Sequence, residues 1–175
     1  MGVDRVVIYN TSCGPDLDRL LQSYSREGFV EMVPWPIDQH LNPSRGWLFS
    51  ESGGDVHYFG QLTTLNECIY RSMDRSRYVL LNDIDEIIMP YQHNNLMMVQ
   101  QTSIHEVLKM YGEKFKVPPD ICRIIHSPIS MPRPPEQVHL DTRLWDFTYE
   151  LLPRVTTVLR RAGLLGSQGQ DKDVM

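Results

Sequence analysis

Apolar runs alternate with helical patterns along the first half of the chain. Residues 3–9 and 29–33 are short apolar runs typical of buried strands, and residues 16–26 between them repeat leucines at helical spacing. Residues 62–73 place apolar side chains on one helical face, and a third apolar run follows over residues 78–81. Because strands that alternate with helices pair in parallel, this pattern predicts an α/β fold with a mostly parallel sheet flanked by helices.

The second half of the chain is less regular. A helix is predicted over residues 103–111 and a short strand over residues 121–125. Residues 140–165 predict a helix with a break near Pro153, since proline removes a helical hydrogen bond. The polar residues 166–175 are predicted to form a flexible tail.

Composition narrows the class of protein. The 175 residues carry 41% hydrophobic and 22% charged side chains and a net charge of -5, which predicts one soluble domain. No stretch approaches the roughly 20 apolar residues of a membrane span. The absence of a Lys/Arg run argues against a nucleic-acid partner. Three widely spaced cysteines predict neither a zinc ribbon nor a disulfide framework.

An acidic cluster follows the third apolar run. Side chains two apart on an extended segment lie on the same side, roughly 6 to 7 Å apart, so Asp83 and Asp85 are predicted to share a divalent cation while Ile84 packs on the opposite side. Carboxylates suit Mg²⁺ or Mn²⁺, which keep positions open for a diphosphate. Glu86 is predicted to lie just outside the metal ligands and to hold them in place. The alternative interpretation is a charged turn after a buried strand.

Four further polar side chains are candidates for this site. The amides of Gln61 and Asn66, near the start of the helix over residues 62–73, either reach a ligand or face water. His126 follows the short strand over residues 121–125, and of the six histidines it is the best candidate for a functional role. Arg71 either pairs with a phosphate or lies solvated on the helix surface.

Four sequence blocks together resemble glycosyltransferase family 92. They are, in order, residues 28–37, 58–61, 66–71 and 78–90. The resemblance is clear over residues 3–90 and fainter to residue 165, so residues 1–165 are interpreted as a partial family 92 domain. The resemblance implies an incomplete GT-A-like fold.

The resemblance also implies an activity. Family members are inverting glycosyltransferases that use a nucleotide sugar such as UDP-galactose, with Mn²⁺ held by a DxD motif. Asp83 and Asp85 match that motif, with Asp85 on the metal and Asp83 on ribose or metal; Gln61 and Asn66 are assigned to the nucleotide sugar. The acceptor is a glycan or glycoprotein, and the expected location is the Golgi membrane. The candidates for the general base are Glu106, Asp120, Glu136, Asp141 and Asp146.

The chain departs from the family pattern at both ends. By the resemblance, the chain is expected to begin near the second strand of the family's sheet, after the first strand and the membrane anchor, and no His-Tyr-Arg-like segment, whose histidine completes the metal site in the family, is found in it. These departures leave open a non-catalytic remnant that acts as an interaction domain. A third hypothesis is a phosphotransferase or phosphatase of the haloacid dehalogenase type, with Asp83 as nucleophile. Ile87 stands where that fold expects Thr or Val, which argues against it.

Overall fold

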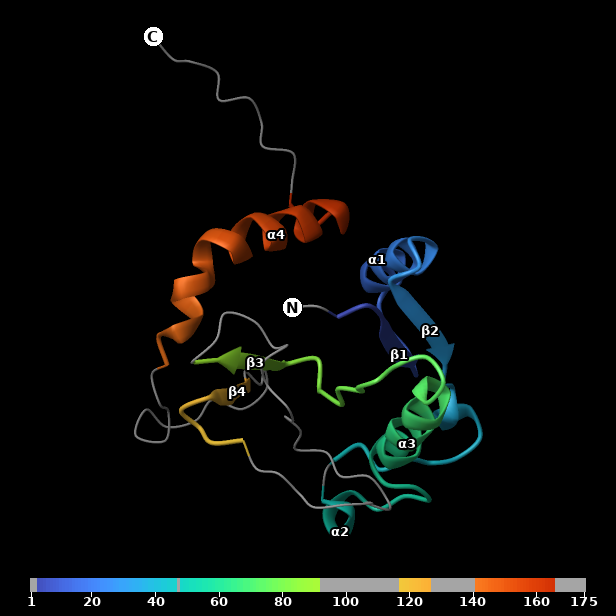
Figure 1. The fold of residues 1–175 in the computed structure, drawn as a ribbon. Helices are drawn as coiled ribbons and strands as arrows, with labels where there is room; N and C mark the ends of the chain where they lie inside the picture. Colours follow the sequence, from blue (N-terminus) through green and yellow to red (C-terminus); the bar gives the residue numbers. More distant parts are fainter. Residues whose placement is uncertain (1–2, 47, 92–116, 127–140, 166–175) are drawn as a thin grey trace.

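The computed structural model describes residues 3–46, 48–91, 117–126 and 141–165 (Figure 1). The described chain forms two small sheets with helices around them. Its regular elements are β1 (Val6–Asn10), α1 (Pro15–Arg26), β2 (Val30–Pro34), α2 (Phe49–Ser52), α3 (Gln61–Ser72), β3 (Glu86–Pro90), β4 (Cys122–His126) and α4 (Thr148–Arg161), with 3-10 turns at Ile37–Gln39, Tyr58–Gly60 and Arg143–Phe147.

The first sheet is the predicted strand, helix, strand unit. β1 and β2 pair in parallel from Val6 opposite Val30 onward, and α1 connects them. Pro15 opens α1, where the missing N–H costs nothing, and Gly28 ends the connection with a φ of 79° that favours glycine. Leu21 of α1 is buried. These elements confirm the α/β class.

The second sheet differs from the prediction. β3 and β4 are antiparallel, and β3 begins at Glu86, after the acidic cluster rather than before it. The predicted strand over residues 78–81 is wrong, because no described strand pairs with that run and a strand needs a neighbour for its hydrogen bonds. Of this run only Leu81 is buried. The predicted short strand over residues 121–125 is confirmed as β4.

The C-terminal helix also differs in detail. The break lies between the Arg143–Phe147 turn and α4, and α4 continues through Pro153. At its other end Arg161 donates from Nε to Ser23 Oγ at 2.7 Å and lies 4.5 Å over the ring of Tyr24, which ties α4 to α1. The predicted helix over residues 103–111 and the tail over residues 166–175 lie outside the described residues.

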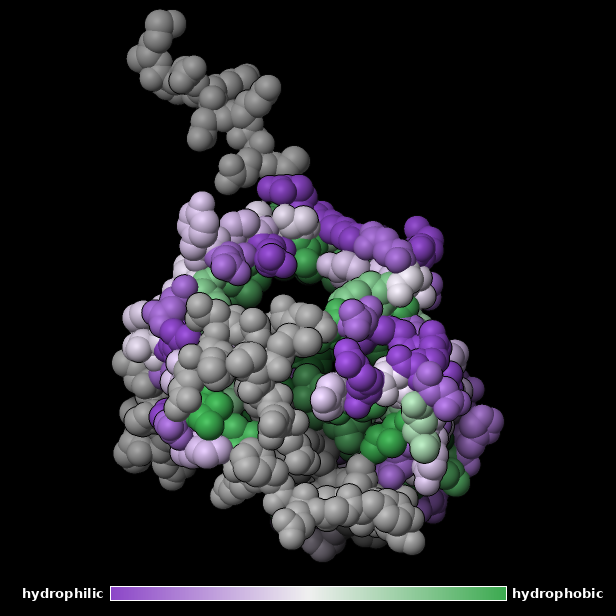
Figure 2. Space-filling view, viewed as in Figure 1, coloured by the Kyte–Doolittle hydropathy of each residue, from purple (hydrophilic) through white to green (hydrophobic). Residues whose placement is uncertain are grey.

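The described core is small. Its buried apolar side chains are Leu21, Val30, Leu81, Ile88, Met89, Cys122 and Ala162. Figure 2 shows hydrophilic side chains along the outer side of α4 and apolar ones toward the interior. Within the described ranges, no helix combines the length and the apolarity that crossing a membrane requires.

Candidate functional site

The acidic cluster forms a turn that leads into β3. The backbone N–H of Glu86 donates to the carbonyl of Asp83 at 3.2 Å, which closes the turn around Ile84 and Asp85. Ile84 is 92% exposed, so the expectation that it packs against the sheet is wrong. An extended segment would have turned Ile84 inward; a closed turn points it to solvent. The backbone here forms a charged turn, as in the alternative interpretation. This turn precedes a strand, however, whereas the alternative expected it to follow one.

Side chains of the cluster hold this turn, which we call the acidic turn (residues 82–86). The buried carboxylate of Glu86 accepts a hydrogen bond from the backbone N–H of Asp83 at 3.1 Å. Asn82 donates from Nδ2 to the carbonyls of Asp83 and Glu86, at 2.8 and 2.9 Å. Glu86 therefore fixes the backbone that carries Asp83, an arrangement in keeping with the supporting role expected of it.

Asp83 is bound from the first part of the molecule. Gln61, the first residue of α3, donates from Nε2 to Asp83 Oδ1 at 3.0 Å. The structure thus brings together two predicted site residues that lie 22 positions apart in the sequence. Asn66 lies one turn further along α3 and donates from Nδ2 to the Leu62 carbonyl at 2.7 Å.

Asp85 is bound from the second sheet. The strand register places His126, the last residue of β4, opposite Glu86, and His126 Nε2 lies 3.1 Å from Asp85 Oδ2. Both side chains remain partly exposed, at 47% and 35%. The two aspartates therefore have different partners, one on α3 and the other on β4. The signal for His126 in the sequence was its position directly after a short strand.

The donor atoms of the acidic turn suit a divalent cation. Carboxylate oxygens and an imidazole nitrogen are ligands that Mn²⁺ accepts. The 3.1 Å between Asp85 Oδ2 and His126 Nε2 is a hydrogen-bond distance, and this contact brings the two donors close together. Within the described ranges no group of three His, Cys, Asp or Glu side chains is placed to hold a metal ion, so the described turn offers a pair of donors.

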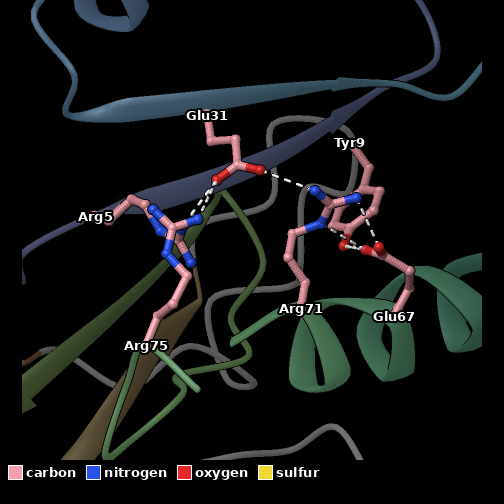
Figure 3. A network of polar contacts seen from close by, with 6 residues as sticks. All are labelled: Arg5, Tyr9, Glu31, Glu67, Arg71 and Arg75. Atoms are coloured by element: carbon pink, nitrogen blue, oxygen red, sulfur yellow. Dashed lines mark hydrogen bonds and ion pairs between the residues drawn. The ribbon is translucent and has the colours of Figure 1, made fainter. Parts of the chain in front are cut away.

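Arg71 belongs to a charge network that joins α3 to the first sheet (Figure 3). Its guanidinium donates to both carboxylate oxygens of Glu67, at 2.7 and 3.1 Å, and to Glu31 of β2 at 3.0 Å. Glu31 also accepts from Arg5 at 2.8 Å, and the hydroxyl of Tyr9 donates to Glu67. Arg71 is thus paired within the fold while it stays exposed on the helix surface, the second of the two positions considered from the sequence.

This network shifts the pKa values of its members. The hydrogen bond from Arg71, and then that from Tyr9, lowers the pKa of Glu67. Burial, followed by the hydrogen bond to Glu67, raises the pKa of Tyr9 far above its ordinary value. Both shifts keep Glu67 ionised and Tyr9 neutral near neutral pH, which preserves the contact between α3 and β1.

Two of the base candidates are engaged elsewhere. The carboxylate of Asp141 accepts from the Tyr91 hydroxyl and from the backbone N–H of Arg143, the latter at 3.0 Å. Asp146 pairs with the Arg143 side chain at 2.7 Å. Asp120 lies exposed just before β4. The other two candidates, Glu106 and Glu136, lie outside the described residues.

A polar cavity in the loop after β2 was not found from the sequence. It measures about 350 Å³ and lies beyond the carboxyl end of β2, where ligands of parallel sheets bind. The sequence signal was the long loop over residues 38–58, which alone does not say which side chains converge. The cavity is lined by Asp38, Gln39, His40, Leu41, Asn42, Pro43, Arg45 and Asp55.

Comparison with known proteins places the chain in a family. A sequence model described as glycosyltransferase family 92 matches residues 1–98, more than half of the 175 residues. Comparison with the curated proteins and with the solved structures returns no match. The matched part contains the first sheet, α3, the acidic turn and β3, and it includes all four blocks on which the resemblance rested. The chain therefore belongs to glycosyltransferase family 92, and glycosyl transfer is the activity of that family.

Proposed function

We propose that this chain carries the donor site of an inverting, metal-dependent glycosyltransferase. The proposed donor is a nucleotide sugar such as UDP-galactose, and the proposed acceptor is a hydroxyl of a glycan or glycoprotein. The family match supports sugar transfer. The observation that carries the donor site is the acidic turn, in which Asp83 and Asp85 are each bound by a partner distant in sequence.

The cation in this proposal is Mn²⁺ or Mg²⁺. Asp85 and His126 are the side chains that would hold it, with Asp83 beside them at the ribose or the metal. When bound, such an ion offsets the negative charge that grows on the diphosphate leaving group. The donor chemistry fits, because the carboxylate of Asp85 and the imidazole of His126 leave further coordination positions for phosphate oxygens and water.

The protein side chains have separate tasks in the proposed reaction. Glu86 and Asn82 hold the acidic turn in one conformation, so that the carboxylates meet the donor without reorganising. Inversion requires a base that takes the proton of the acceptor hydroxyl as it attacks the anomeric carbon. Asp141 and Asp146 are poor choices for that base, because hydrogen bonds and an ion pair already occupy their carboxylates.

Titration calorimetry with Mn²⁺ and UDP tests the proposal. Wild type is expected to bind both, and Asp85→Ala is expected to weaken binding at least about tenfold, since it removes a metal ligand. Asp74→Ala is the matched control, because Asp74 is an exposed aspartate just after α3. Failure of wild type to bind, or equal binding by wild type and Asp85→Ala, rejects the donor site.

One observation favours the non-catalytic alternative. The described residues hold no group of three metal-binding side chains, as an assembled metal site would. Release of UDP or transfer of sugar by Mn²⁺-loaded protein from UDP-galactose would exclude this alternative. Golgi location stays a prediction from the family resemblance.

A further inference from the structure

The backbone before α3 adopts a conformation that ordinary residues avoid. Tyr58, Phe59 and Gly60 have φ values of 39°, 53° and 72°, so two residues with large side chains stand in the left-handed region. This conformation is costly for a residue with a side chain, so it persists only where surrounding contacts enforce it. We call this segment the left-handed turn (residues 58–60).

Two side chains anchor the left-handed turn. Ser44, whose side chain is almost fully buried, accepts a hydrogen bond from the backbone N–H of Tyr58 at 2.7 Å. Trp35 donates from Nε1 to the Phe59 carbonyl at 2.9 Å. A side chain at Gly60 would come within 3.0 Å of Ile37, so the turn is also packed tightly. These contacts hold the segment in the left-handed conformation.

The left-handed turn determines where α3 begins and thus where Gln61 stands. Gln61 is the first residue of α3, and its amide reaches across to Asp83 of the acidic turn. Because Gln61 Nε2 is committed to Asp83 Oδ1 at 3.0 Å, that oxygen is held in place and the carboxylate cannot rotate freely. At its other end α3 is fixed to β2 by the ion pair of Arg71 with Glu31.

We infer that Gln61 is a positioning residue, placed by the left-handed turn, which acts on donor binding through Asp83 and does not touch the donor itself. This inference rests on the proposed function. It differs from the role expected from the sequence, a direct contact between Gln61 and the nucleotide sugar. A fixed carboxylate binds its ligand without first losing side-chain rotamer freedom, which is the benefit of preorganisation.

A double-mutant cycle separates the two roles of Gln61. Affinity for Mn²⁺ with UDP is measured for wild type, Gln61→Ala, Asp83→Ala and the double variant. Gln61→Ala is expected to weaken binding about tenfold in wild type, the size of a hydrogen bond to a charged group. It is expected to change nothing in the Asp83→Ala background, because its partner is then absent. Gln22→Ala, an exposed glutamine of α1, is the matched control.

The other outcomes are equally informative. An equal loss in both backgrounds means that Gln61 contacts the ligand directly, and no loss in wild type means that it has no role; either result overturns the inference. If Asp83→Ala binds too weakly to measure, Gln61→Glu decides: it cannot donate to ionised Asp83, so wild-type affinity would overturn the inference. Absence of binding by wild type rejects the proposed function itself, whereas binding with no Gln61 effect rejects only the positioning role.

Discussion

The two sheets of this protein are held together in different ways. The parallel pair β1–β2 is tied to α3 by charged side chains from three segments, with Glu31 and Arg71 at the centre. The antiparallel pair β3–β4 rests on its own ladder and on buried apolar residues such as Ile88 and Met89. The first region thus combines the buried Leu21 and Val30 with polar contacts at its surface, and the second combines its ladder with the burial of Ile88 and Met89.

The acidic turn belongs to both regions. Asp83 is bound by Gln61 of α3, and Asp85 lies against His126 of β4. A motif of three consecutive residues therefore depends on contacts with segments that lie far away in the sequence. The spacing of the two carboxylates is therefore set by how α3 and β4 flank the turn, as well as by the local backbone.

The largest effect is expected from the core of the second region. Ile88→Ala should lower the free energy of unfolding by about 3 kcal/mol, because Ile88 is 6% exposed and its removal leaves a cavity. Ile84→Ala, four residues earlier, is the control and should change stability by no more than about 0.5 kcal/mol, since Ile84 is 92% exposed. Urea unfolding measures both. Equal effects of the two changes would contradict the described path of β3.

An intermediate effect is expected from the network of the first region. Glu31→Gln should lower the free energy of unfolding by about 1 to 2 kcal/mol, because Arg5 and Arg71 lose their charged partner. Hydrogen exchange should rise in α3 while β3 stays protected. Glu51→Gln, at an exposed position of α2, serves as control. Loss of protection in β3 to the same extent would mean that the two regions unfold together.

The smallest effect is expected from pH. Since the pKa of Glu67 is lowered on folding, its contribution to stability is present above the ordinary value of about 4.3 and is lost as pH falls through the folded value. Glu67→Gln should therefore lower the melting temperature slightly at pH 7, and the difference from wild type should shrink as acid protonates Glu67 in the folded protein. The effect is small because the side chain is 40% exposed. A difference from wild type that does not shrink with falling pH would show that packing, and not charge, is responsible.

The elements of the first region and the family of the chain could be predicted from the sequence alone. Apolar spacing was enough for β1, α1, β2 and α3, because neighbouring segments form this unit and local preferences agree with it. Four sequence blocks were enough for the family, whereas the roles of Gln61, Asp83 and Asp85 at the site stay predictions.

The arrangement of the second region depends on tertiary contacts that could not be predicted from the sequence. Residues 78–81 have the apolar character of a strand but find no strand partner among the described residues, whereas Glu86–Pro90 finds β4. Hydrophobicity is a property of single residues, but a strand exists only when another segment satisfies its backbone hydrogen bonds. The partners of Asp83 and Asp85 could not be predicted either, because they come from distant segments that only folding brings to the acidic turn.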